Sequence, residues 1–319
     1  MTNHPSPQDG EQKPETPATP DFSKFNVQDS FSIPAKDTTM PGKAPDEHRR
    51  ISRQQLAAID IALSDRDRQV LLAVQKYRYL LTGQVQRLYF LEAATPAAAL
   101  RATSRNLKKL KELGLVDSLS RRIGGVRAGS SGLVWYLTHA GERLLRLRDH
   151  KPYPSKRFFE PSPHFLAHGL AVAEISIRLT EICREHASGL SVLELEPECW
   201  RTYSDYGAML SLKPDLFAVT MSDEYEDRWF FEVDLATESP AKILEKCDRY
   251  HKYYRSGLEQ EKSEVFPLTV WVVPDSTRKE RLIAHIREAF DKQPKLFAVI
   301  TTEELEDLIR YGGNREILC

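Results

Sequence analysis

The sequence predicts a mixed α+β protein, in which a basic and largely helical N-terminal domain precedes a domain with a mixed central sheet flanked by helices. Apolar residues recur at helical spacing in three segments of residues 64–150, and two short alternating stretches follow them. Residues 164–319 instead switch repeatedly between helical and strand patterns. At about 150 residues per domain, a chain of 319 residues has room for two such cores.

Charge divides the chain in the same way. Residues 64–151 hold 17 Lys and Arg against 7 Asp and Glu, a net charge of +10, whereas residues 152–319 hold 21 against 30, a net charge of −9. The net charge of the whole chain, −1, hides this asymmetry. A basic module attached to an acidic one favours contact with a polyanion through the basic part.

Composition sets the expected domain boundaries. Residues 1–48 hold eight of the nineteen prolines and few aliphatic residues, which predicts a disordered tail. We expect a first domain at 49–150, a proline-rich linker at 151–163 and a second domain at 164–319. No apolar run approaches the roughly 18 residues that span a bilayer, and the four cysteines form no CxxC pair. We therefore expect a soluble, cytoplasmic protein with no membrane partner, no zinc ribbon and no disulfide framework.

Three helices are expected in the basic segment. Ser64 and two following acids are typical of a helix start, and Thr82 is predicted as the N-cap of a second, short helix. The third helix, within residues 97–113, buries leucines on one side and ends before Gly114. Its other side is basic, with Arg101, Arg105, Lys108 and Lys109.

Two strands joined by a glycine-rich tip follow the third helix. Arg121 and Arg122 precede this tip and Arg127 lies within it, and a closing helix begins after Thr138. This order resembles that of winged helix-turn-helix proteins, so we expect double-stranded DNA as a partner. The predicted DNA contacts are Arg101, Arg105, Lys108, Lys109, Arg121, Arg122 and Arg127. The alternative for the helix is an ordinary solvated face.

The second domain reads as alternating helices and strands. Helices are expected at 164–186, 239–257 and 276–290, and strands at 191–200, 213–221, 227–236, 266–274 and 296–301. In the strand around Glu232, alternation places Phe230, Glu232 and Asp234 on one face. Two acids on an apolar strand are costly to bury without partners or a metal ion. Asp215 begins the preceding strand, and Glu174 on the long helix is expected to face the same point.

An Asp followed on the next strand by a Glu-x-charged triplet resembles the core of PD-(D/E)XK nucleases. The resemblance implies a nuclease-like domain in which Asp215, Glu232 and Glu174 hold Mg²⁺ or Mn²⁺, with Asp215, Glu232, Asp234 and Lys246 as the catalytic set. Asp234 stands where that superfamily has lysine. Lys242 or Lys246 from the next helix is expected to replace it, or else Asp234 adds a third metal ligand.

Another alternative remains open for these acids. The fold could be kept for binding, with the acids held by Thr237, Lys246 or Arg249.

Two smaller patterns also have two interpretations each. His164 and His168 have the i, i+4 spacing of metal ligands but no further ligand motif nearby, and Tyr250, Tyr253 and Tyr254 suit either base stacking or helix packing.

The order of short motifs resembles the replication-relaxation family over about residues 64–275. These motifs are LGLVDS, YLTHAGERLL, HGLAVAEI, KPD and FFEVDLATES, followed by a helix with Lys246 and Tyr250. The resemblance implies a role in plasmid replication or in DNA topology and transfer on bacterial mobile elements. We therefore expect a DNA-binding accessory or regulatory factor. Other replication or transfer proteins are expected partners, and a homodimer stays open.

Two alternatives remain. One is a metal-dependent endonuclease or nickase targeted by the winged helix. The weaker one is a transcriptional repressor with an effector-binding second domain.

Overall fold

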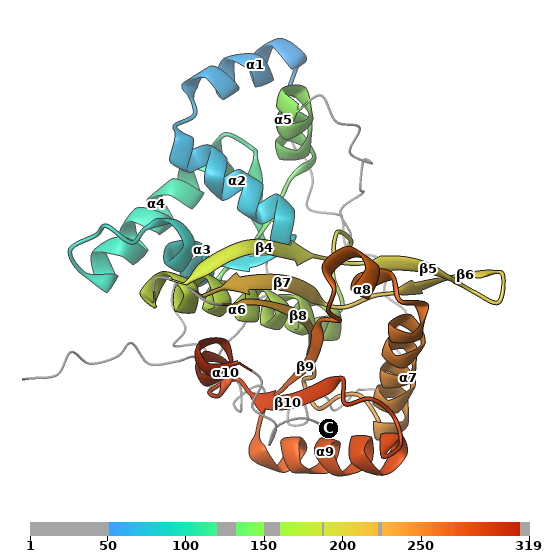
Figure 1. Ribbon diagram of the computed structural model, residues 1–319. Coiled ribbons are helices and arrows are strands. Elements are labelled where there is room, and N and C mark those ends of the chain that lie inside the picture. Colours follow the sequence, from blue (N-terminus) through green and yellow to red (C-terminus); the bar gives the residue numbers. More distant parts are fainter. Residues whose placement is uncertain (1–50, 120–131, 150–159, 187, 223–224, 313–319) are drawn as a thin grey trace, which may run out of the picture. The chain divides into compact units, whose positions relative to one another are not determined.

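The computed structural model describes residues 51–119, 132–149, 160–186, 188–222 and 225–312 (Figure 1). All of the described residues belong to one compact unit. The expected tail at 1–48 and most of the expected linker at 151–163 lie outside the described residues. In the described part, no helix is both long enough and apolar enough to cross a membrane. The boundaries expected from the sequence stay predictions.

The part from Arg53 to Asp149, here called the N-terminal module, is mainly helical (Figure 1). Strand β3 pairs antiparallel with both β1 and β2, so its small sheet has the order β1-β3-β2. After the lead-in helix α1, this is the element order expected for a winged helix-turn-helix, although the tip at 120–131 lies outside the described residues. The elements are α1 (Arg53–Ala62), α2 (Asp65–Tyr77), β1 (Leu80–Leu81), α3 (Thr82–Tyr89), α4 (Pro96–Glu112), β2 (Val116–Ser118), β3 (Val134–Leu137) and α5 (His139–Asp149).

Local sequence signals explain where most of these helices begin. Ser64 caps α2, and its side chain accepts from the backbone N–H of Asp67. The prediction that Thr82 is the N-cap of α3 is wrong. Leu81 occupies that position, and the Gln84 side chain accepts from its backbone N–H at 3.0 Å. The Thr82 hydroxyl accepts instead from the Trp135 indole N–H at 2.9 Å, which fixes the start of α3 to β3.

Two glycines in the quoted motifs have a structural reason. Gly114 has a φ of 73°, the left-handed conformation that ends α4 as expected. Gly141 lies in the first turn of α5, where an added Cβ would stand 2.2 Å from the carbonyl oxygen of Leu115. The motif around Gly141 therefore lets α5 pack directly on the turn that follows α4.

The part from Pro163 to Tyr311, here called the C-terminal module, is built on a five-stranded mixed sheet with the order β10-β9-β8-β7-β4. Strands β8, β9 and β10 are parallel, whereas β7 runs antiparallel to both β8 and β4. Its elements are α6 (Pro163–Glu185), β4 (Gly189–Leu195), β5 (Arg201–Asp205), β6 (Ala208–Leu212), β7 (Leu216–Met221), β8 (Glu226–Val233), α7 (Pro240–Ser256), α8 (Leu258–Ser263), β9 (Leu268–Val273), α9 (Ser276–Phe290), β10 (Phe297–Thr301) and α10 (Leu305–Tyr311).

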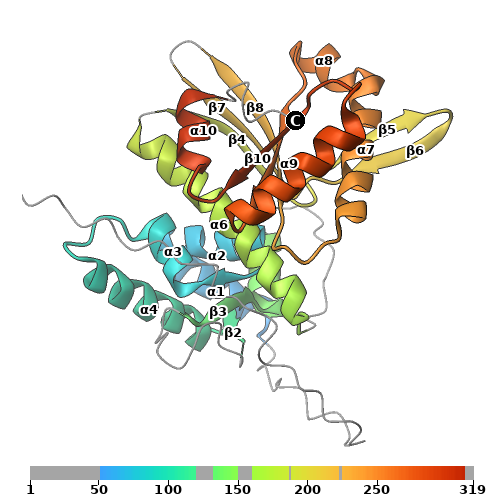
Figure 2. The ribbon, with the colours of Figure 1, turned by 90° about the horizontal axis from the view of Figure 1, so that it is seen from below.

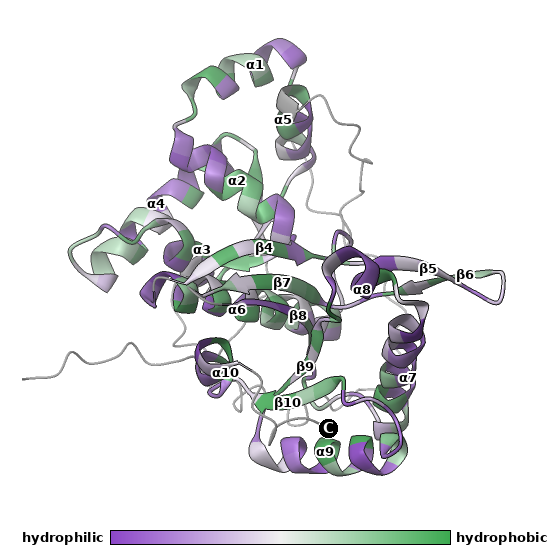
Figure 3. Cartoon of the chain, viewed as in Figure 1, coloured by the Kyte–Doolittle hydropathy of each residue, from purple (hydrophilic) through white to green (hydrophobic). Residues whose placement is uncertain are grey.

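Helices cover both faces of this sheet, as a mixed sheet with apolar strands requires (Figures 1 and 2). Helices α6 and α10 pack with Trp229 and Phe231 on one face, while α7 and α9 pack with Phe230 on the other. The alternation expected for this strand is thereby confirmed. Strands β9 and β10 are hydrophobic along most of their length, whereas α9 carries polar residues on its outer side (Figure 3).

Besides the two-residue strand β1, three features were not expected from the sequence. The two-stranded hairpin β5–β6 leaves Tyr206 and Met209 exposed at its end, so it lacks the apolar alternation of a core strand. Helices α8 and α10 have only 6 and 7 residues, too short for a clear helical period. None of the three changes the order of the central sheet.

Candidate nucleic-acid interface and acid cluster

Helix α4 presents the basic face expected from the sequence. Ala99, Leu107 and Leu110 are buried on one side of the helix and hold it against the module core. Arg101, Arg105 and Lys108 are exposed on the other side, at positions i, i+4 and i+7. These three cations therefore share one solvent-facing stripe.

The other predicted DNA contacts divide into two groups. The ammonium of Lys109 lies 2.6 Å from Asp67 of α2, so this lysine ties two helices together. Burial opposes ionisation of Asp67, but hydrogen bonds from Lys109 and Ser64 outweigh it and lower the pKa of that carboxyl. Arg121, Arg122 and Arg127 lie outside the described residues.

In the C-terminal module, Asp215 and Glu232 meet where two antiparallel strands adjoin. Leu216 of β7 pairs with Phe231 of β8, and the same register places Asp215 opposite Glu232. Asp215 donates its N–H to the Phe231 carbonyl at 3.1 Å, and its carboxylate accepts from the Val233 N–H at 2.7 Å. Both acids are buried, with 6% and 2% of their surface exposed.

Two side chains of α7 engage the buried Glu232. The Lys246 ammonium lies 3.1 Å from one carboxylate oxygen, and the Tyr250 hydroxyl donates to the other at 2.8 Å. The two residues are four apart, so both project from one face of the helix. The structure thus brings Asp215, Glu232 and Lys246 together, with the lysine supplied by α7.

Burial and charge perturb the pKa values of Glu232 and Lys246. Burial, reinforced by the negative charge of Asp215, raises the pKa of Glu232 to about 7 despite Lys246 and Tyr250. Burial lowers the pKa of Lys246, but Glu232 and Asp215 outweigh it and raise that pKa overall. Perturbation of this kind is common at functional sites, though structural ion pairs produce it too.

His168 adds a second cationic partner, which the sequence did not assign to Asp215. Its Nε2 lies 3.0 Å from the Asp215 carboxylate. Burial lowers the pKa of His168, but the hydrogen bond and charge of Asp215 outweigh burial and raise it. Its helical neighbour His164 is exposed, so the i, i+4 pair does not converge with the acids as metal ligands.

Two acids named with this site have other partners. Asp234 accepts from the Arg278 guanidinium at 2.6 Å and from the Ala236 N–H at 2.9 Å, which anchors α9 to the end of β8. The expectation that Glu174 faces the acid cluster is wrong, because its carboxylate accepts from Arg87 and Gln84 of α3. Arg87 was not recognised in the sequence because nothing local pairs it with a residue 87 positions away.

The carboxylates of the acid cluster do not fit the divalent cation that the resemblance implies. The carboxylates of Asp215 and Glu232 are suitable ligands for such a cation. Each of their four oxygens, however, already accepts a hydrogen bond from His168, Val233, Tyr250 or Lys246. Among the described residues, no three His, Cys, Asp or Glu side chains are grouped so that they could hold a metal ion. Lys246 and His168 supply positive charge where a metal ion would otherwise do so.

A family model described as replication-relaxation matches residues 71–269, more than half of the chain. The chain belongs to the replication-relaxation family. The matched segment includes α4 as well as Asp215, Glu232 and Lys246. Among solved structures, restriction endonuclease FokI is similar at 11% identity over 85% of this chain and 75% of that chain, with a TM-score of 0.23, too low to support any argument. No curated protein matched.

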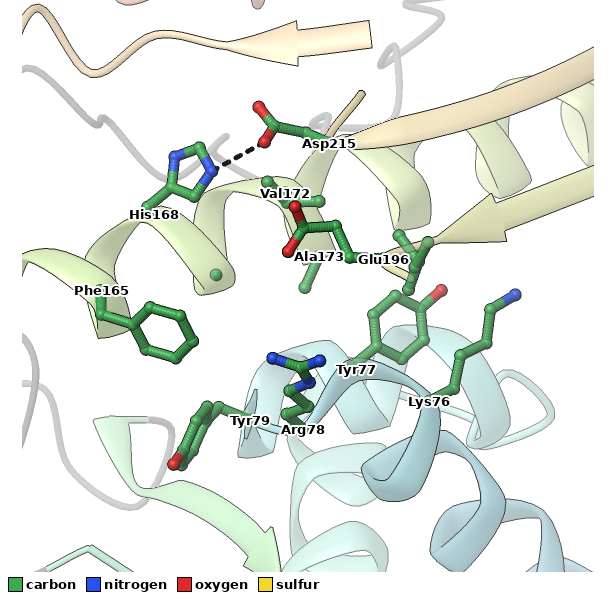
Figure 4. Close-up of a pocket in the computed structure, with 12 residues that line it drawn as sticks. Lys76, Tyr77, Arg78, Tyr79, Phe165, His168, Val172, Ala173, Glu196 and Asp215 are labelled. Carbon is green, nitrogen blue, oxygen red and sulfur yellow. Dashed lines mark hydrogen bonds and ion pairs between the residues drawn. The ribbon is translucent and has the colours of Figure 1, made fainter. Parts of the chain in front are cut away.

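In this replication-relaxation protein a cleft lies directly beside the His168–Asp215 pair (Figure 4). One wall is the end of α2 and the residues after it, from Lys76 to Tyr79. The opposite wall is the beginning of α6, including Phe165 and Gly169. The cleft therefore connects the end of a helix in the N-terminal module with the edge of the acid cluster.

Glu232 is expected to make the stability of this replication-relaxation protein depend on pH. Its pKa is about 7 in the folded chain against an ordinary value of 4.5. Between these two pH values the folded chain therefore binds a proton at Glu232 more tightly than the unfolded chain does, and this proton binding stabilises the fold. This stabilisation is complete below pH 4.5 and is lost as the pH rises through 7. The free energy of unfolding of wild type minus that of Glu232→Gln, measured in urea, should therefore fall between pH 5 and pH 8.

The control is Glu226→Gln, which changes an exposed carboxylate on the same strand. Its unfolding free energy should follow that of wild type across the same range. A constant difference between wild type and Glu232→Gln from pH 5 to pH 8 would contradict the perturbed acid cluster.

Proposed function

We propose that this protein is a duplex-DNA-binding accessory or regulatory factor in the replication, relaxation or transfer of a bacterial plasmid or mobile element. The observation that carries the proposal is the exposed basic stripe of α4. Within the described residues, Arg101 and Arg105 have no acidic partner, and Lys108 approaches only Glu112, at 3.8 Å. Unpaired and exposed cations keep their full charge for phosphate oxygens.

The surroundings of α4 support its role as a recognition helix. In helix-turn-helix proteins the second of two consecutive helices enters the major groove while the first crosses the backbone. Here α3 precedes α4 and is fixed to β3 through Thr82 and Trp135. Helix α4 itself is held by buried Leu107 and Leu110 and by the Lys109–Asp67 ion pair, so it can present a rigid face to a duplex.

Charge and family agree with this assignment. The net charge of +10 in residues 64–151 is large enough to attract a polyanion despite the acidic remainder of the chain. Membership of the replication-relaxation family points to replication and relaxation as the setting. Plasmid location, the accessory role and the protein partners belong to the proposal.

Removal of the arginines of α4 tests this proposal. The double variant Arg101→Gln, Arg105→Gln should weaken binding of a fluorescent duplex by the full chain. The logarithm of the binding constant falls linearly with the logarithm of the salt concentration, and each lost phosphate contact should make this slope less steep by about 0.9. Loss of both contacts should make it less steep by about 2. Fluorescence anisotropy from 50 to 200 mM NaCl measures both quantities.

The matched control is Arg249→Gln, Lys252→Gln, which removes two exposed cations from α7. It should bind duplex like wild type. If the α4 variant and the control show the same affinity and the same salt slope, α4 is not the DNA-binding face.

Metal-dependent nicking of DNA is a second candidate function. It is favoured by Lys246, which reaches Glu232 beside Asp215 although Asp234 stands at the expected lysine position. We rank it second because all four carboxylate oxygens already accept from protein donors. The leading proposal needs no hydrolysis.

Conversion of supercoiled plasmid to nicked circle separates the two functions. With Mg²⁺ or Mn²⁺, the nuclease candidate predicts conversion by wild type and at least roughly 100-fold slower conversion by Asp215→Ala and by Glu232→Ala. Glu245→Ala, at an exposed acid of α7, should nick like wild type. An inactive wild type, or Asp215→Ala and Glu232→Ala variants as fast as wild type, would eliminate the nuclease candidate.

A further inference from the structure

We propose that the cleft between the end of α2 and the start of α6 binds an unpaired DNA nucleotide, so that the preferred ligand is duplex DNA carrying a single-stranded segment. The inference rests on the proposed function, because it specifies the strand state of the DNA that the protein binds. It also assigns a role to residues outside both α4 and the acid cluster.

An exposed aromatic ring lies at the mouth of this cleft. Phe165 lies in the first turn of α6 and is 46% exposed. Its ring meets that of Tyr79 edge to face, with centroids 6.5 Å apart and planes at 87°. The two rings therefore do not stack on each other. Aromatic rings of this kind stack on unpaired bases with little dependence on sequence.

Cationic side chains line the same cleft. Arg78 has no acidic partner among the described residues, and its guanidinium points into the space near Phe165 (Figure 4). Its backbone has a φ of 65°, a left-handed conformation that non-glycine residues rarely adopt and that is often retained at functional positions. Lys76 and His168 line the cleft as well, but the Lys76 ammonium donates to the Leu193 carbonyl at 3.0 Å and His168 bonds Asp215. The guanidinium of Arg78 is therefore the group offered to a phosphate.

The cleft also offers an acceptor suited to a base. Glu196 lines it, and the one donor to its carboxylate within the described chain is the Trp200 indole N–H, at 3.4 Å. The N–H groups on a base edge are suitable donors for such a carboxylate. An aromatic face, one unpaired guanidinium and an acceptor in one cleft match the three parts of a nucleotide better than they match an anion alone.

A helical glycine keeps the cleft open. Gly169 lies within α6, where glycine lowers helix stability relative to alanine. A Cβ added there would find no heavy atom within 4 Å, so packing does not require glycine at this position. A larger side chain at Gly169 would project into free space along the cleft wall. Substitution there can block the cleft without a clash.

Binding of tailed duplexes by the full chain tests the proposal. The probes are a blunt fluorescent 20-base-pair duplex, the same duplex with a six-thymidine single-stranded tail, and the same duplex with a six-uridine RNA tail. Wild type should bind the DNA-tailed duplex about 10-fold more tightly than the blunt one, as expected from stacking of one base. Gly169→Leu, and separately Phe165→Ala with Arg78→Gln, should reduce the DNA-tailed affinity to that of the blunt duplex.

The control is Leu258→Ala with Arg249→Gln, which removes one exposed apolar side chain and one exposed cation elsewhere. It should keep the preference for the tail. Equal affinity of wild type for tailed and blunt duplexes would overturn the proposal, as would a preference that survives in Gly169→Leu. A stronger preference for the RNA tail would overturn the assignment to DNA.

Failure of the proposed function would look different. In that case the blunt duplex would bind independently of Arg101 and Arg105, whatever the effect of the tail.

Discussion

The ion-pair network around Arg87 holds the two modules in one unit. This arginine of α3 binds both Glu174 and Glu181 of α6, with a distance of 2.7 Å from its Nε to Glu181. Gln84 of α3 adds hydrogen bonds to Glu174 and to the carbonyl of Leu170. Glu174 is only 3% exposed, so loss of Arg87 would leave a buried charge uncompensated, which typically costs about 3–5 kcal/mol.

The position of the cleft follows from this network. Helix α6 carries Glu174 and Glu181 as well as Phe165, His168 and Gly169, so fixing α6 to α3 also fixes one cleft wall opposite Arg78. His168 in turn bonds Asp215 at the start of β7. Helix α6 thus makes polar contacts with α3 on one side and with the start of β7 on the other.

The buried acids of the C-terminal module are also paired with donors from the chain itself. Glu232 is buried and has Lys246 and Tyr250 as partners, while Asp234 has Arg278. Buried carboxylates are tolerated when hydrogen bonds and an opposite charge compensate for lost hydration. Glu232 and Asp234 are therefore compensated by side chains of the chain itself.

Much of this architecture could be predicted because it depends on local patterns. The periodicities of α4, β8 and α7 predicted their burial, and the alternation around Glu232 placed it correctly beside Phe230 and opposite the face of Phe231. Lys246 was among the lysines expected to reach the acids. Arg87, Arg278 and the His168–Asp215 bond could not be predicted, because each joins residues more than 40 positions apart. Glu174 was misassigned for the same reason, since helix periodicity gives its face but not the neighbouring helix.

The central claim is that α4 is the surface that meets duplex DNA. Photocrosslinking with a duplex containing 5-bromodeoxyuridine, followed by mass spectrometry of the full chain, maps that surface directly. The account predicts cross-links in the peptide that contains Arg101, Arg105 and Lys108, and their disappearance when excess unlabelled duplex competes. Cross-links confined to the C-terminal module, with none in α4, would contradict it.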